Sequence, residues 1–311
     1  MIKDRNIDPG AAILASKVQG ILPEGPVTGE VHYVAKSGIQ ARTWLDGKVS
    51  VSNLHKLTED AIAKCVASRG DVVYVCPGHT ETIASAGDLT LNVAGVSVIG
   101  LGNANLRPTY TWSATDSTCA ISAANVSFKN IITTVSVDEV VSMFNVTGAG
   151  VTLDRADFVP WASGQALQFL LTTNAADQLT IQNCNHRQTA AANTAQKWIQ
   201  LVGPDNTRIL NNTIWMTAKA DTGSHAISGS TAVIQAEIVG NRIAFLGATI
   251  DCIINLVTGS TGIIADNRLA GGAAVVLAAA IKGDQCMMFE NYVTNTAAAS
   301  GIVGPVVDTV T

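Results

Sequence analysis

The sequence is short of charged residues. Asp, Glu, Lys and Arg make up 14% of the 311 residues, and apolar residues make up 47%. An average soluble domain carries about 25% charged residues. The few Lys and Arg residues form no run and the formal net charge is −5, which disfavours nucleic acid and anionic membranes as partners. Because so few charges cover a chain of this size, we expect part of its surface to be buried against other subunits or a larger assembly.

Long hydrophobic runs are missing too. The longest apolar stretch, Gly271–Ile281 ("GGAAVVLAAAI"), is too short to span a bilayer. The N-terminal "MIKDRNIDPGAAIL" has no apolar core of the kind that a signal peptide needs. We therefore expect no membrane partner and folding in a cytoplasm.

Paired cysteines are also lacking. The chain has no C-x-x-C and no histidine at zinc spacing, so we predict no metal site and no cofactor. We expect the cysteines to be small buried hydrophobes in a reducing compartment. They are Cys65, Cys76, Cys119, Cys184, Cys252 and Cys286.

What the chain does contain is a repeat. An apolar strand with a polar corner behind it recurs every 24 to 30 residues, and a second strand with a glycine turn precedes most copies. No helical period interrupts this pattern. Stacked coils of two or three short strands bury a face that one coil cannot bury alone, so the sequence predicts a right-handed parallel β-helix of about eight coils. The strands align on Val98, Phe128, Leu153, Ile181, Ile209, Ile238, Ile264 and Met288.

Asparagines recur at the corner behind these strands, at Asn212, Asn241, Asn267 and Asn291. Asparagine tolerates the left-handed backbone of a tight bend, and its amide can bond to the equivalent amide one coil away. We predict a structural asparagine ladder there rather than a binding site.

A single amphipathic helix is predicted ahead of the coils, in Leu57–Ser68 ("LTEDAIAKCVAS"), with Leu57, Ile62, Cys65 and Val66 on its apolar side. It runs into "RGDVVYVCPGHTETI". This order of helix, glycine, strand and Pro-Gly resembles the entry of pectin-lyase-like right-handed β-helices. The resemblance implies that the helix caps the open end of the coil and that the "VVYV" strand is the first strand of its wall.

A narrower resemblance covers most of the chain. "NIDPGAAILASKVQGIL" (Asn6–Leu22), "GEVHYVAKSG" (Gly29–Gly38) and "LTLNVAGVSVIGLGN" (Leu89–Asn103), together with the capping helix, resemble β-helix proteins encoded among the virion genes of tailed bacteriophages. That resemblance implies a non-enzymatic particle component that forms a homotrimer, is assembled in the host cytoplasm and contacts the major capsid protein or another virion protein.

Catalytic patterns are weak. Hydrolases and lyases on this fold need clustered carboxylates on one outer face. The best candidates, Asp154 and Asp157 in "LDRADF", have no second carboxylate at the matching places of the next coil. We expect a solvated turn with a local ion pair there, exposed turn polarity at His79 and Glu81, a solvated corner at His186, and no enzyme activity.

The sequence divides into an N-terminal arm (1–27), a β segment and connection (28–56), the capping helix (57–69) and the β-helix (70–311). The arm lacks a core of its own, and its apolar residues must be buried somewhere. They pack either on the rod itself or, as we predict, on a capsid protein or a neighbouring subunit. The expected contact residues are Ile7, Pro9, Ile13, Leu14, Lys17, Val18, Ile21 and Leu22.

These patterns lead to three candidate functions. The first is a head decoration, or cement, protein on the capsid surface. The second is a tail fibre or tailspike-like receptor-binding protein. The third is a polysaccharide lyase or hydrolase, which the missing carboxylate stacks disfavour.

Overall fold

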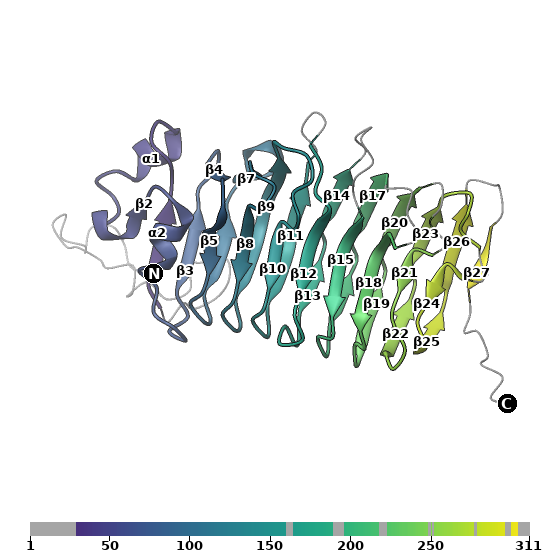
Figure 1. Ribbon diagram of the computed structural model, residues 1–311. Helices are drawn as coiled ribbons and strands as arrows, with labels where there is room; N and C mark the ends of the chain where they lie inside the picture. Colours follow the sequence, from purple (N-terminus) through teal and green to yellow (C-terminus); the bar gives the residue numbers. More distant parts are fainter. Residues whose placement is uncertain are drawn as a thin grey trace, which may run out of the picture.

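The computed structural model describes residues 29–159, 164–188, 196–217, 223–247, 250, 252–276, 279–295 and 300–303. The predicted contact residues of the N-terminal arm lie outside these ranges. The described chain is all-β, with 48% strand and 7% helix, and its parallel strands form a solenoid of about eight turns. Figure 1 shows a rod with the helices gathered at the N-terminal end, which confirms the predicted right-handed parallel β-helix.

The first wall of the rod contains the strands that the sequence repeat identified. All eight anchor residues, from Val98 to Met288, lie opposite one another in register from coil to coil. In spatial order the strands are β2 (Leu54–His55), β1 (Val31–Val34), β3 (Val72–Val75), β6 (Ser97–Gly100), the first part of β9 (Ser127–Val135), the first part of β11 (Thr152–Phe158), β13 (Thr180–Gln182), β16 (Arg208–Leu210), β19 (Ala236–Val239), β22 (Thr261–Ala265) and β25 (Gln285–Phe289).

The second wall follows each corner of the first. Its strands are β4 (Thr80–Ile83), β7 (Thr109–Trp112), the later parts of β9 and β11, β14 (Asn185–Gln188), β17 (Thr213–Thr217), β20 (Arg242–Leu246), β23 (Arg268–Gly271) and β26 (Asn291–Asn295).

The third wall is a separate sheet of eight strands. It contains β5 (Ala86–Leu91), β8 (Thr118–Ile121), β10 (Phe144–Val146), β12 (Gln168–Thr172), β15 (Lys197–Val202), β18 (His225–Thr231), β21 (Ile254–Asn255) and β24 (Ile281–Lys282). These strands include the glycine-turn strands of the repeat.

The "VVYV" strand, β3, is not the first strand of its wall. β1 pairs with it in parallel and β2 pairs with β1, so the segment 28–56 contributes two strands to the same sheet. β3 is also buried on both faces: Val73 and Val75 point into the main core, whereas Val72 and Tyr74 cluster with Ile99 on the other side. Because β3 is apolar on both faces, its sequence has no alternation of apolar and polar residues that would distinguish the core face from the other face.

The N-terminal end is closed by a shorter helix than predicted. Besides α1 (Gln40–Leu45) and the 3₁₀ turns η3 (Val51–Asn53) and η4 (Ala104–Leu106), the structure has α2 at Thr58–Ile62. Thr58, Ala61 and Ile62 are its buried residues. Leu57 and Val66, which we expected on the apolar side, are about half exposed.

The segment between α2 and β3 has its own hydrogen bonds and turns. The Asp71 carboxylate accepts a hydrogen bond from the Val66 backbone at 2.7 Å, and Ser68 and Gly70 adopt positive φ angles of 58° and 81°. This left-handed backbone turns the chain toward β3. A helix that continued through these residues would have directed the chain away from the first wall.

The far end carries a different closure. β27 (Ser300–Val303) folds back and pairs antiparallel with β26. Within the described residues, none of the helices has the length and apolar character needed to cross a membrane.

The core runs the length of the rod as one cluster of buried side chains. Aromatic rings stack in its middle: Phe144 lies edge-on to Trp112 at 5.3 Å and to Phe169 at 5.2 Å between ring centroids. Five of the six cysteines are buried and all six are free thiols. Cys65 alone is half-buried, so the expectation of small buried hydrophobes is confirmed for the other five.

The predicted asparagine ladder is present. The Asn212 side-chain amide donates to Asn241 Oδ1 at 3.0 Å, Asn241 donates to Asn267 at 3.0 Å, and Asn267 donates to Asn291 at 2.9 Å. The left-handed bend, however, is made by the residue before each ladder asparagine, such as Asn211 with a φ of 55° and Gly240 with 71°. The ladder residues are therefore buried hydrogen-bonding groups, and their neighbours make the turn.

Removing one ladder amide should destabilise the whole rod. Asn241 is fully buried, accepts hydrogen bonds from the Asn212 backbone and side chain, and donates to the Ile209 carbonyl. Asn241→Ala leaves these groups unpaired, so we expect a loss of about 3 kcal/mol in the free energy of unfolding. Urea unfolding measures it.

The control for that measurement is Asn185→Ala, because Asn185 is an exposed asparagine on the same wall. Its change should stay within about 0.5 kcal/mol. Equal effects of the two substitutions would contradict the ladder.

Candidate functional site

His79 and Glu81 form a closed polar network at the capped end. Both side chains are buried, so the expectation of exposed turn polarity is wrong. The Lys36 backbone donates to His79 Nδ1 at 3.1 Å, which leaves Nε2 to donate to Glu81 Oε2 at 3.1 Å. The same carboxylate oxygen accepts the backbone N–H of Thr58 at 3.0 Å and its hydroxyl at 2.7 Å.

The described residues bury the side chains of this network, Tyr110 among them. The Tyr110 hydroxyl lies 2.7 Å from the Thr58 hydroxyl, and burial raises the pKa of Tyr110 well above its ordinary value. These contacts tie the start of α2 to β4 and β7. The histidine–carboxylate pair is therefore a structural link between cap and coil.

The "LDRADF" corner is likewise held by structural partners. Asp154 accepts the Asn183 amide at 2.8 Å and lies between Lys129 and Gln182 in register. Asp157 pairs with Arg107 at 2.7 Å. The predicted local ion pair is present between Arg155 and Asp154, at 3.4 Å, but Asp154 is buried and not solvated.

His186 lies inside the coil and not at a solvated corner. Its ring stacks on Phe158 with a centroid distance of 4.4 Å and meets the edge of Phe169 at 5.1 Å. Its Nε2 atom lies 3.3 Å from Gln188 Oε1. Burial in this aromatic setting lowers the pKa of His186 to about 3, so the ring is neutral at physiological pH.

One cluster at the capped end has the composition of a metal site. Ligand atoms of His32, Cys65 and Asp71 lie within 4.8 Å of one another. The Asp71 carboxylate, however, already accepts the backbone N–H groups of Glu30 and Val66 and two N–H groups of Arg69, all at 2.7 Å. Its lone pairs are used to join these segments, so the cluster is a structural junction.

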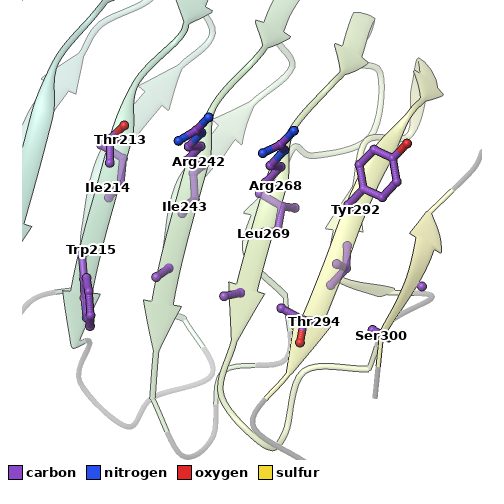
Figure 2. A pocket seen from close by; sticks show the side chains of 14 residues that line it. Thr213, Ile214, Trp215, Arg242, Ile243, Arg268, Leu269, Tyr292, Thr294 and Ser300 are labelled. Carbon is purple, nitrogen blue, oxygen red and sulfur yellow. The ribbon is translucent and has the colours of Figure 1, made fainter. Parts of the chain in front are cut away.

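An open groove lies on the outer face of the second wall, across β17, β20, β23 and β26. It has a volume of about 570 Å³, and Ser300 and Gly301 of β27 also line it. Figure 2 shows Arg242 and Arg268 side by side, with Trp215 and Tyr292 at opposite ends of the groove. Both aromatic side chains are 51% exposed.

The register of the strands builds the groove from two outward columns. The first column is Thr213, Arg242, Arg268 and Tyr292, each opposite the next. The second is Trp215, Ala244, Ala270 and Thr294. The small side chains of the two alanines leave space between Trp215 and Tyr292 and form the floor of the groove. The two arginines form one edge of the groove.

The two groove arginines differ from other arginines of the rod. Arg208 pairs with Glu237 at 2.7 Å, Arg107 with Asp157 and Arg69 with Asp71. Among the residues that the structure describes, no ion pair reaches Arg242 or Arg268. Two like charges on neighbouring strands repel each other, so this edge is a cationic site to which the described residues bring no counter-charge.

The sequence contains a signal for this groove that the catalytic patterns do not reveal. Thr213, Arg242, Arg268 and Tyr292 are each the residue that follows a ladder asparagine. Reading down that position of the repeat gives the outward column directly, whereas a search for carboxylate pairs passes over it.

The buried neutral His186 should make stability depend on pH. Its pKa is about 3 in the folded chain and about 6.5 when unfolded. Between these values only the unfolded chain binds the proton, so stability is lost as pH falls below about 6.5. From pH 7 to pH 5 we expect His186 to cost about 2 kcal/mol of unfolding free energy.

Urea unfolding at the two pH values measures this loss, and His186→Phe is the comparison because it keeps the aromatic stack. Burial also lowers the pKa values of His32 and His55, so the variant should keep a shallower slope. Equal slopes in the two proteins would contradict a buried neutral ring at His186.

Comparison of the chain with protein-family models, with curated proteins and with solved structures found no match.

Proposed function

We propose that the chain is a non-enzymatic structural protein of a tailed-phage virion. In this proposal it acts as a homotrimer on the capsid surface, where it binds the major capsid protein or another virion protein and stabilises the head. The resemblance of most of the chain to phage β-helix proteins supports the virion setting. The geometry supports the structural, non-catalytic part.

The observation that carries the proposal is that the candidate catalytic carboxylates are bound to structural partners. Glycoside hydrolysis needs two carboxylates that face the substrate. Here Glu81 is sealed under the cap by Thr58 and His79, and Asp154 and Asp157 are each bound to a structural partner. The candidate catalytic acids therefore form hydrogen bonds and ion pairs that stabilise the coil.

A rigid rod suits a decoration role. Strands of successive coils are hydrogen-bonded along its length and one core runs through it. Such a body can bridge adjacent capsid subunits and add buried interface area without deforming. The low fraction of charged residues, 14%, favours a surface that is partly covered in an assembly.

A receptor-binding role on the tail is the second candidate, and one observation favours it. The groove on β17, β20, β23 and β26 offers exposed aromatic and cationic side chains in a concave surface. Sites of this kind are typical of ligand binding.

Capsid binding tests the first role. The full-length trimer should bind expanded capsids of the parent phage and raise their melting temperature. Because the arm is predicted to be the attachment segment, deletion of residues 1–27 should leave a trimer of unchanged thermal stability that no longer binds. Light scattering and calorimetry measure these properties.

The matched control is Asn185→Ala, which should bind capsids as the unaltered chain does. A cryo-electron microscopy map of the virion that places the chain only on the tail would sink the decoration role.

A further inference from the structure

We propose that the groove on the second wall binds an acidic polysaccharide, with Arg242 and Arg268 holding its carboxylates and Trp215 and Tyr292 stacking on its sugar rings. This site goes beyond the structural role proposed above. The inference depends only on the residues of the groove, so it stands or falls separately from the location of the protein on a virion.

The first step is the charge of the edge. Arg242 and Arg268 lie opposite each other on neighbouring parallel strands, about 4.8 Å apart at the backbone. The residues that line the groove include no carboxylate in the described part of the chain. Two guanidinium groups at this spacing gain from an anion that accepts hydrogen bonds from both, because planar guanidinium pairs well with carboxylate or sulfate oxygens.

The second step is the shape between the aromatic rings. Trp215 and Tyr292 lie on β17 and β26, three coils apart, and Ala244 and Ala270 form the low surface between them. Flat aromatic faces suit the apolar face of a sugar ring, and small residues leave room for one. The Arg187 guanidinium lies over the Trp215 ring at 5.8 Å, which orients that ring and adds a third positive charge.

The groove suits an acidic glycan better than nucleic acid, the other common polyanion. Nucleic-acid binding depends on neutralising a phosphate at every nucleotide along an extended basic surface. This groove offers two arginines and a neighbouring third on a chain of net charge −5. A polysaccharide with one carboxylate on each ring or on alternate rings needs fewer cations and uses the stacking surfaces.

The groove is built for binding and not for cleavage. Its lining contains neither a carboxylate nor a histidine among the described residues, whereas a lyase of this fold class would need acidic groups to hold calcium beside a basic residue. We therefore expect the ligand to be held intact.

Isothermal titration calorimetry with short oligogalacturonates and hyaluronan oligosaccharides tests the site. The unaltered chain should bind one or both. Arg242→Gln and Arg268→Gln should each weaken binding about tenfold, because each removes a charge-assisted contact, and should flatten its dependence on salt. Trp215→Ala should weaken binding by a similar factor and leave the salt dependence unchanged.

Arg208→Gln is the matched control, because Arg208 is an exposed arginine on the first wall, outside the groove. It should bind as the unaltered chain does. All four variants change exposed side chains, and unchanged thermal melting verifies that each is folded.

Any of the following results would overturn the proposal: no binding of either acidic oligosaccharide, equal binding of neutral dextran, or tighter binding of a single-stranded oligonucleotide. Groove variants that bind like Arg208→Gln would also overturn it. None of these results bears on capsid binding, so the two proposals fail separately.

Discussion

The structure depends on one contact repeated along the rod: a short strand hydrogen-bonded in register to the equivalent strand of the next coil. One coil cannot bury its own apolar face, and only stacking removes that face from water. The buried column from Val98 to Met288 and the asparagine ladder beside it both follow from this register. So does the groove, because the same register places residues far apart in sequence side by side on the outer face.

Stacking also explains why reactive side chains end in structural roles. A polar group that points inward at a corner is cut off from water and must find a partner inside the coil. Glu81 finds Thr58 and His79 at the cap, and Asn241 finds the equivalent asparagines in the coils on either side. His186 instead lies between aromatic rings as a neutral imidazole.

The structure could be predicted from the sequence where the repeat is regular, and not where a bend breaks the alternation of inward and outward residues. The anchor column and the ladder could be predicted because the same residue types return at a fixed spacing. Inward and outward positions near a bend could not, because a left-handed residue breaks the alternation. In β11 two residues instead of one, Asp154 and Arg155, separate the core residues Leu153 and Ala156, and Arg155 has a φ of 55°. Asp154 was misread for that reason, and His79 lies directly after Gly78, which has a φ of 74°.

The groove illustrates a second limit. Arg242 and Arg268 become neighbours only when the coils are stacked, and a pair of this kind does not show in any one segment of the sequence.

The register between strands of adjacent coils can be measured directly. Arg208 and Glu237 lie opposite each other on the outer face of adjacent coils, at a backbone separation of about 4.8 Å that a disulfide can span.

The doubly substituted chain with Arg208→Cys and Glu237→Cys should cross-link under mild oxidation, as peptide mapping would show. A chain with Arg208→Cys and Val239→Cys, two residues out of register, should stay reduced. Equal cross-linking of both pairs, or cross-linking of the second pair alone, would contradict the stacked coil.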